Sequence, residues 1–387
     1  MGRRKRKRGR SLWAALLLAG LLAAAVFQER SASQHADPAR EQVDAPGSAT
    51  EPARAPRRSR GAGRRVPESS PFHSLAACEA QLAARQRPTS RGPRVGTWNV
   101  RWFPYGSTNR RDGARATDLR WLACAIASLD VDVLAVQEFV QDPGGRGALI
   151  DLRARLDALT GGRWREHLDD CPGTGFQHIG FLFDSARVQL QAPQVLAALN
   201  PGDGACDRSL RPGLGAYARF GGGPDLHLVA LHLDSGVTAR DFGHRVLSVN
   251  ALERVLPQLA RTAADPDLLV LGDFNTMGCK DCAPPVTAET ELARMDARLR
   301  ALTLTRIAAP AGQSCSQYYR GKAGALDHVV ARAGMDELAP GSVVEIHGPC
   351  RDLACGPAAA GEDVDAWQHL SDHCPIVIEL QPRDRDP

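Results

Sequence analysis

The sequence predicts an α/β fold, and we expect a sandwich that contains two mixed β-sheets. Apolar runs of strand length alternate with helical patterns near both ends of the globular part, and shorter runs between them resemble hairpin pairs. No second linker interrupts this part of the chain. We therefore expect one domain over residues 71–387.

The spacing of apolar residues predicts each element in turn. After Asp118, for example, Leu119, Leu122, Ile126 and Leu129 recur at the spacing of a helix. The segments 179–183 and 188–190 are predicted to be a pair of strands that turn around residues 184–185. We expect helices over 72–86, 118–128, 149–159, 241–260 and 289–300, and further strands over 94–100, 131–136, 226–233, 268–271, 326–331 and 376–380.

Charge is unevenly distributed along the 387 residues, although the formal net charge is only +4. Residues 1–65 carry 15 Lys/Arg against 5 Asp/Glu, a net charge of +10, whereas residues 66–387 carry 33 against 39, a net charge of −6. The contents of 37 Gly and 26 Pro exclude a collagen-like or wholly disordered chain. The acidic balance of the folded part argues against a protein that coats nucleic acid with its whole surface.

The N-terminus has the pattern of an export signal. Residues 1–10 hold seven Arg/Lys, and residues 11–27 follow without a charge. Residues 1–30 are therefore expected to be a signal peptide or an uncleaved N-terminal membrane anchor, and both alternatives stay open. Residues 31–70 are rich in Arg, Pro and Ala and are expected to be a disordered linker. The domain would then lie outside the cytoplasm, in a periplasmic, extracellular or membrane-anchored location.

The ten cysteines agree with export into an oxidising compartment. Cys124 and Cys374 lie in apolar surroundings and are expected to be free thiols. The other eight are expected to form up to four disulfide bonds, with a connectivity that the sequence leaves open. Cys279 and Cys282 are interpreted as a disulfide that closes a loop rather than a zinc or redox site, because no second such pair occurs in the chain.

Polar, oxygen-bearing residues follow apolar strands at five places. They are Asn99, Glu138, the pair Asp273 and Asn275, Asp327, and the pair Asp372 and His373. A single aspartate of this kind often caps a turn, but five such strand ends together indicate a site. Carboxylate and amide oxygens suit Mg²⁺, with Mn²⁺ as an alternative, better than zinc. His232 also ends a strand, and we expect it to face the same site.

The motifs GTWNVRW, AVQEF, LHL, LGDFN, ALDH and SDHCP occur in this order between Gly96 and Pro375. In these motifs the chain resembles the endonuclease/exonuclease/phosphatase superfamily of deoxyribonuclease-like, metal-dependent phosphohydrolases. The resemblance covers residues 94–380. It implies a four-layer α/β sandwich, in which two mixed β-sheets pack face to face and are flanked by helices.

The resemblance also implies a role for each residue of the site. Glu138, Asn99 and Asp372 resemble the metal-site residues, and Asp273 and Asn275 resemble the pair that positions the phosphate and the attacking water or metal. His373 resembles the histidine base that Asp327 orients. His232 resembles the histidine that acts on the leaving oxygen or on a phosphate oxygen.

Two positions depart from the family pattern. Arg101 stands where some members have an aspartate, and Gln177 and His178 stand where a glutamate can pair with the second histidine. Arg101 and Arg240 are our candidate substrate-binding residues. A basic groove beside the site would also draw on other arginines of these regions, namely Arg110, Arg111, Arg115, Arg120 and Arg245.

The expected protein is a monomeric, exported or membrane-anchored hydrolase that depends on Mg²⁺. A phosphodiesterase or endonuclease is the favoured activity, with a nucleic acid or a phospholipid headgroup as the phosphodiester substrate. A phosphatase or a sphingomyelinase-like enzyme is the alternative within the same chemistry. A catalytically silent binding module, tethered to the membrane through residues 11–27, is the alternative of another class.

Overall fold

The computed structural model describes residues 66–85, 91–107, 115–171, 177–200, 202, 206, 211, 213–319, 322–352 and 364–384. All described residues belong to one compact unit, Arg60–Pro387. The expected signal or anchor and nearly all of the expected linker lie outside the described residues. Within the described ranges, no helix is both long enough and apolar enough to cross a membrane.

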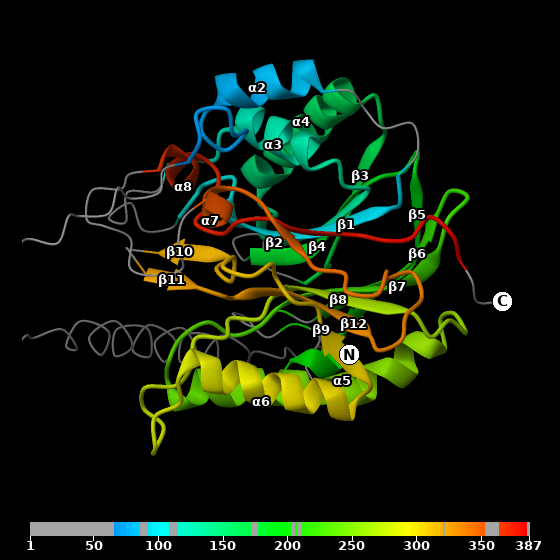
Figure 1. Ribbon diagram of the computed structural model, residues 1–387, viewed down its shortest axis with the longest axis vertical. Coiled ribbons are helices and arrows are strands. Elements are labelled where there is room, and N and C mark those ends of the chain that lie inside the picture. Colours follow the sequence, from blue (N-terminus) through cyan, green and yellow to red (C-terminus); the bar gives the residue numbers. More distant parts are fainter. Residues whose placement is uncertain are drawn as a thin grey trace, which may run out of the picture. The chain divides into compact units, whose positions relative to one another are not determined.

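Two six-stranded sheets pack face to face, and helices cover their outer faces (Figure 1). The first sheet has the order β13-β14-β1-β2-β4-β3 and the second β5-β6-β7-β8-β12-β9. Both sheets are mixed, because β1 pairs parallel with β2 and antiparallel with β14, and β7 pairs parallel with β8. This confirms the four-layer α/β sandwich.

The strands of the first sheet are β1 (Arg94–Phe103), β2 (Val133–Val140), β3 (Trp164–Leu168), β4 (Gln177–Asp184), β13 (Glu345–Ile346) and β14 (Ile376–Glu379). Those of the second are β5 (Val188–Leu196), β6 (Gly213–Phe220), β7 (Asp225–His232), β8 (Leu268–Asp273), β9 (Leu304–Arg306) and β12 (Asp327–Arg332). A separate hairpin joins β10 (Gln317–Tyr319) to β11 (Lys322–Gly324). Apolar side chains of both sheets form the central core.

The longer helices of the described residues lie on the outer faces of the two sheets (Figure 1). They are α2 (Leu75–Ala84), α3 (Leu119–Leu129) and α4 (Pro143–Thr160) on one side, and α5 (Ala239–Ala260) and α6 (Ala288–Ala301) on the other. The short helices α7 (Pro349–Asp352) and α8 (Asp365–His369) precede the last strand. Asp142 caps α4 just before Pro143, so this helix starts earlier than its apolar spacing predicts.

The prediction that 179–183 and 188–190 form a strand pair is wrong. β4 pairs with β2 and β3 in the first sheet, whereas β5 pairs with β6 in the second. The turn between them, closed by a hydrogen bond from Arg187 N to Asp184 O of 2.9 Å, carries the chain from one sheet to the other. Both strands are individually correct, but local sequence does not encode their partners.

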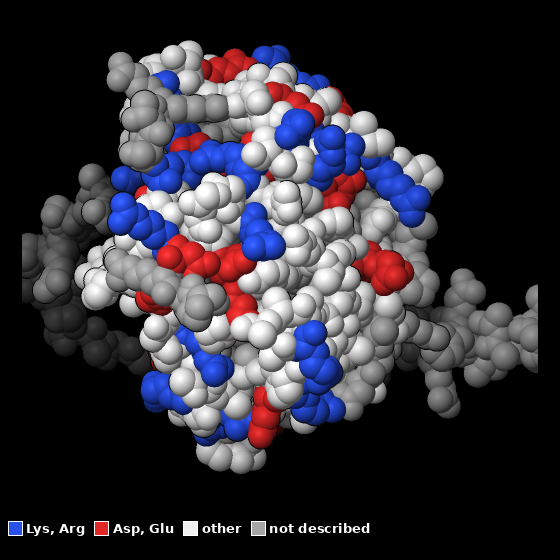
Figure 2. Space-filling model, turned by 90° about the vertical axis from the view of Figure 1, so that its right-hand side faces the viewer, with Lys and Arg blue, Asp and Glu red and all other residues white. Residues whose placement is uncertain are grey.

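Charges of both signs are interspersed on the face shown in Figure 2. Lys and Arg side chains form no continuous basic expanse there, since acidic and uncharged groups separate them. The picture agrees with the acidic balance of residues 66–387 and with the exclusion of a wholly basic surface.

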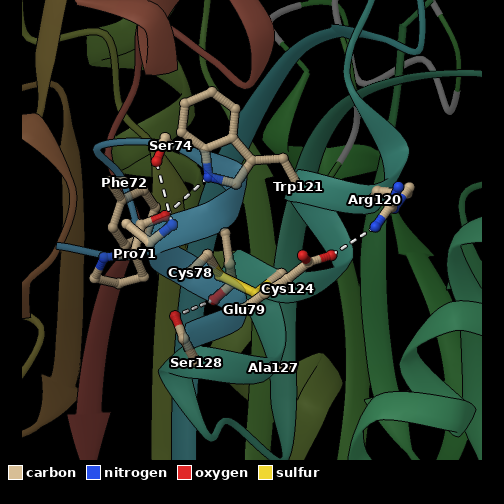
Figure 3. The surroundings of a disulfide bond; sticks show 12 residues. Pro71, Phe72, Ser74, Cys78, Glu79, Arg120, Trp121, Cys124, Ala127 and Ser128 are labelled. Atoms are coloured by element: carbon tan, nitrogen blue, oxygen red, sulfur yellow. Dashed lines mark hydrogen bonds and ion pairs between the residues drawn. A yellow bond between two sulfur atoms is a disulfide. The ribbon is translucent and has the colours of Figure 1, made fainter. Parts of the chain in front are cut away.

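Four disulfide bonds join pairs of described cysteines, namely Cys78–Cys124, Cys171–Cys206, Cys279–Cys282 and Cys350–Cys374. Cys315 is disulfide-bonded as well. The loop-closing bond of Cys279 is therefore confirmed. The expectation that Cys124 and Cys374 are free is wrong. Both are buried as expected, but each lies next to another buried cysteine and is bonded to it, as Figure 3 shows for Cys78 and Cys124.

Candidate active site

Five strand ends meet at one edge of the sandwich. In the first sheet, Asn99 of β1 is in register with Gln137 of β2, the neighbour of Glu138. In the second sheet, Asp273 at the end of β8 is in register with His232 of β7 on one side and with Asp327 of β12 on the other. The two groups then contact each other across the sandwich, because Asn99 Nδ2 donates to Asp273 Oδ2 at 3.0 Å.

Glu138 reaches the site because β2 is irregular at this point. The pairing of β2 with β4 shifts between Val136 and Phe139, and Glu138 has a φ of 66°. This left-handed conformation is strained for a residue with a side chain and is typical of functional positions. Glu138 Oε1 accepts a hydrogen bond from Asn99 Nδ2 at 3.1 Å, and Oε2 accepts one from Trp102 N at 3.0 Å.

Asp273 lies at the centre of the cluster and is 1% exposed. The preceding Gly272 has a φ of 150°, and a Cβ atom there would lie 2.0 Å from Leu231 O, so the close approach of β7 requires glycine. Burial raises the pKa of the Asp273 carboxyl to about 7, although the charge of His373 opposes the shift. The Asp273 carboxyl can therefore exchange a proton near neutral pH.

Asn275 does not continue the extended backbone of β8. β8 ends at Asp273, and Asn275 has a φ of 50°. Its backbone N–H donates to Asp273 Oδ1 at 2.9 Å, and its side-chain Nδ2 donates to Leu233 O at 3.0 Å. Phe274 between them packs into the core under α5 and α6. Asn275 therefore holds the Asp273 carboxylate in place.

His373 and Asp327 form a buried pair. His373 Nδ1 lies 2.8 Å from Asp327 Oδ2, and its Nε2 lies 3.7 Å from Asp273 Oδ2. Burial alone would lower the pKa of the imidazole, but the charges of Asp327 and Asp273 outweigh it and raise that pKa to about 10. The backbone of His373 is fixed by Ser371 Oγ, which accepts from His373 N at 3.0 Å, and by Trp98 Nε1, which donates to His373 O at 3.0 Å.

His232 faces the same cluster, as expected. Its Nε2 lies 3.4 Å from Asp273 Oδ2 and 3.9 Å from Glu138 Oε1. Burial, together with the positive charges of Arg211 and His373, lowers the pKa of His232 well below its usual value. His232 is thus neutral next to two carboxylates.

Arg211 is a residue of the site that the sequence did not reveal. One guanidinium nitrogen lies 3.4 Å from His232 Nε2, and another donates to Gln177 Oε1 at 2.9 Å. Arg211 therefore links Gln177 to His232. Gln177 stands where the family pattern has a glutamate that can pair with this histidine. Arg211 precedes β6 in a segment without a motif, and only the fold brings it to the strand ends.

Asp372 and Arg101 lie on the His373 side of the cluster. Arg101 Nε is 3.7 Å from Asp372 Oδ1, and its guanidinium stands over the ring of Tyr319 at 5.5 Å. The hairpin that carries Tyr319 is held against the site, because Gln317 forms a bridge with His373 and Tyr318 N donates to Asp372 O at 2.8 Å.

The other candidate arginines are dispersed. Arg240 is exposed in the first turn of α5, and among the described contacts none joins it to the cluster. Arg245 is wrong as a groove residue, because it is buried and pairs with Glu291 at 2.7 Å. Arg120 points to Glu79 at 2.8 Å on the outer helices, Arg115 N donates to Gln368 O, and Arg110 and Arg111 lie outside the described residues.

The donor atoms fit a hard divalent cation. Ligand atoms of Asp273, Asp327 and His373 all lie within 4.8 Å of one another. Among the described residues, the buried atoms Asp327 Oδ1 and Asp372 Oδ1 have no hydrogen-bond partner. Asn99 presents its amide nitrogen to the carboxylates, while its oxygen accepts from Arg101 N at 3.1 Å. Carboxylate oxygens with unmet capacity suit Mg²⁺ or Mn²⁺.

Solved structures of known proteins share this architecture. An endonuclease/exonuclease/phosphatase of Bacteroides vulgatus is 16% identical, with a TM-score of 0.50, over 76% of this chain and 100% of that chain. The TDP2 of D. rerio complexed with single strand DNA product is 18% identical, with a TM-score of 0.47, over 76% of this chain and 100% of that chain. No protein-family model and no curated protein matches the sequence. The chain has the endonuclease/exonuclease/phosphatase fold, which confirms the resemblance drawn from its motifs.

Proposed function

We propose that this chain is a metal-dependent hydrolase of phosphate esters, and most specifically a phosphodiesterase or endonuclease. The observation that carries the proposal is the buried pair of His373 and Asp327, whose free imidazole nitrogen faces Asp273 at 3.7 Å. A histidine held by one carboxylate, beside a cluster of further carboxylates, is the arrangement needed to deprotonate water for attack on phosphorus.

Each residue has a distinct part in this chemistry. Asp327 fixes the orientation of His373 and the position of its proton, so Nε2 faces the reacting centre. Asn99 and Asn275 hold the Asp273 carboxylate through two hydrogen bonds. His232, Arg211 and Arg101 supply donors and positive charge for the anionic oxygens of the phosphate.

Glu138 and Asp273 would hold the cation, with Asp372 as the further candidate. Asn99 resembles a metal-site residue of the family, but here its amide nitrogen donates to both carboxylates and would position them. When bound, a divalent cation there would neutralise charge on a phosphoryl oxygen and offset the carboxylate charge that keeps a proton on His373. Mg²⁺ is the ion that we propose, with Mn²⁺ as its substitute.

A panel of substrates tests the proposal. Purified protein should hydrolyse bis-p-nitrophenyl phosphate with Mg²⁺ and lose this activity with EDTA, while p-nitrophenyl phosphate measures phosphatase activity in parallel. Plasmid nicking and sphingomyelin cleavage then separate nuclease from headgroup hydrolysis. Inactivity on all four substrates with Mg²⁺ and with Mn²⁺ would favour the silent binding module.

We also propose that the domain works outside the cytoplasm. The four disulfide bonds between described cysteines support an oxidising compartment, because such bonds are rare where thiols are kept reduced. Fractionation of expressing cells, followed by N-terminal sequencing of the protein, tests this location and distinguishes a cleaved signal from a retained anchor. We expect a monomer, which light scattering measures.

A further inference from the structure

A second cluster of carboxylates lies at the other end of the strands that carry the candidate active site. Asp273 and Asp327 occupy one end of the β8–β12 pair, whereas Asp267 directly precedes β8 and Asp336 and Glu337 follow β12. Ligand atoms of Asp267, Asp336 and Glu337 all lie within 4.8 Å of one another. This second cluster is thus built from two segments that only the fold brings together.

The backbone around this second cluster is fixed on three sides. His227 N donates to Asp267 O at 2.9 Å, and Asp267 N donates to Asp265 Oδ1 at 2.7 Å. Gln381 N donates to Glu337 O at 2.6 Å, which ties the chain after β14 to the turn that bears Glu337. These hydrogen bonds hold the backbone of Asp267 and Glu337 in place, so the carboxylates are brought together by the fold.

Glu337 provides independent evidence that a ligand is needed. The residue is 0% exposed, and among the described residues neither of its carboxylate oxygens has a hydrogen-bond donor in the structure. Burial, and after it the neighbouring Asp267 carboxyl, raise the pKa of Glu337 to about 8. Asp267 is 4% exposed, and its Oδ2 also lacks a donor within the part of the chain that the structure describes. No Arg, Lys or His among the described residues forms an ion pair with Asp267, Asp336 or Glu337. Burial of carboxylates without a donor or a counter-charge costs several kcal/mol each, so something must compensate.

The surroundings add negative charge instead of removing it. Asp265 and Asp384 both interact electrostatically with Asp267. Asp and Glu side chains also gather near the middle of the face in Figure 2, which looks onto this end of the sheets. Asp336 is only partly buried, so an ion from solution can reach the cluster at this residue. The missing counter-charge is therefore expected to come from solution.

We propose that Asp267, Asp336 and Glu337 bind a calcium-type divalent cation at a site separate from the candidate active site. The donors are all oxygens, which excludes the thiolate and imidazole sets that select zinc. Ca²⁺ accepts six to eight oxygens in flexible geometry, so backbone carbonyls and water complete the shell around three carboxylates. The bound ion would fasten the start of β8, the turn after β12 and the end of the chain to one another.

Thermal unfolding of the full chain tests the proposal, with CaCl₂ compared against EDTA. The Glu138→Gln variant serves as the background, because it weakens binding at the candidate active site. We expect the melting temperature to rise by about 5 °C at a hundredfold excess of Ca²⁺ over its Kd. Glu337→Gln and Asp267→Asn, each in that background, should abolish the rise, and calorimetry should find one site fewer in these variants than in the background.

Two results would overturn the proposal. One is a melting temperature that does not change with Ca²⁺ or Mg²⁺ in the Glu138→Gln background. This would mean that the carboxyls of the second cluster share a proton and bind no cation. The other is an undiminished Ca²⁺ response in Glu337→Gln. Should that variant not fold, Asp336→Asn replaces it, because this partly exposed residue tolerates an amide. Neither result depends on hydrolysis, so the site and the proposed activity stand or fall separately.

Discussion

Asp273 and Asp327 lie directly opposite each other in the antiparallel strands β8 and β12. Two carboxylates in this position would repel each other, but the His373 imidazole lies between them, 2.8 Å from Asp327 Oδ2 and 3.7 Å from Asp273 Oδ2. The register of two strands therefore determines that one histidine is shared by two acids. This relationship makes the role of His373 the first to test.

Replacement of His373 by alanine should abolish the proposed base. We expect kcat for bis-p-nitrophenyl phosphate to fall by about 10²–10⁴-fold, because a positioned general base contributes on this order. Asp327→Asn should lose part of the same activity, since it leaves the imidazole without its orienting carboxylate.

His347→Ala is the matched control for His373→Ala. This histidine also pairs with a carboxylate, Glu345, at 3.1 Å, but lies outside the cluster. The control should keep normal turnover. Circular dichroism of all three variants verifies that they fold. A His373→Ala enzyme with near-normal kcat would contradict the assignment of the base.

Glu138→Gln should raise the Mg²⁺ concentration needed for half-maximal activity by at least about tenfold. The amide keeps the size of the side chain and one oxygen, but it removes the charge that attracts the ion. Activity measured as a function of free Mg²⁺ gives this midpoint. Glu166→Gln is the control, because Glu166 is half-buried in the same sheet and pairs with Arg153 away from the site. Equal midpoints in both variants would argue against Glu138 as a ligand.

Sequence reasoning succeeded where a local pattern determined the outcome. A strand that ends in a polar residue delivers that residue to the sheet edge, and parallel neighbours deliver theirs to the same edge. Asn99, Glu138, His232 and Asp273 were brought to the site in this way, whereas His373 precedes β14, which is antiparallel to β1. Element types were found for the same reason, since periodicity depends on near neighbours.

The features that the sequence missed depend on contacts between distant segments. Arg211 reaches His232 from a loop without a motif. Cys124 is buried as expected, but the apolar pattern around it does not indicate that Cys78 of α2 lies within bonding distance. Glu138 owes its direction to a backbone with a φ of 66°, which the pattern of a strand does not signal. Each of these follows from which segment packs against which, and that is a property of the whole fold.

The disulfide bond between Cys78 and Cys124 is expected to contribute substantially to stability. It fastens α2 to α3 across a sequence separation of 46, next to a hydrogen bond of 2.8 Å from Trp121 Nε1 to Pro71 O (Figure 3). Loss of a cross-link over a loop of this length should lower the free energy of unfolding by about 2–4 kcal/mol. Urea denaturation of the double Cys→Ser variant measures this loss.

A second double variant, at Cys279 and Cys282, provides the comparison. These residues are separated by only three positions, so their bond restricts the unfolded chain far less. We expect the smaller loss of stability there. Equal losses in the two double variants would show that loop length does not set the effect.

His328 should make the protein less stable as the pH falls below neutral. Its buried ring lies under the candidate site, with Nε2 3.1 Å from Thr276 Oγ1. Burial, with a smaller effect of the positive charge of Arg306, lowers the pKa of His328 to about 3. In the unfolded chain the pKa of this histidine is about 6.5. Below that pH the unfolded chain therefore binds a proton at His328 that the folded protein does not bind. The stability due to the neutral ring is therefore present above pH ~6.5 and is lost as the pH falls from there towards 3.

His328→Gln separates this contribution from those of other groups. The amide still offers a donor to Thr276 but does not titrate. The free energy of unfolding of the variant should therefore fall less between pH 7 and pH 5 than that of the unchanged protein. The difference between the two pH profiles should be about 2 kcal/mol, from the linkage between protonation and folding. Urea denaturation at several pH values measures both profiles. Parallel profiles would mean that the ring is protonated in the folded state, which the burial of His328 beside Phe274 argues against.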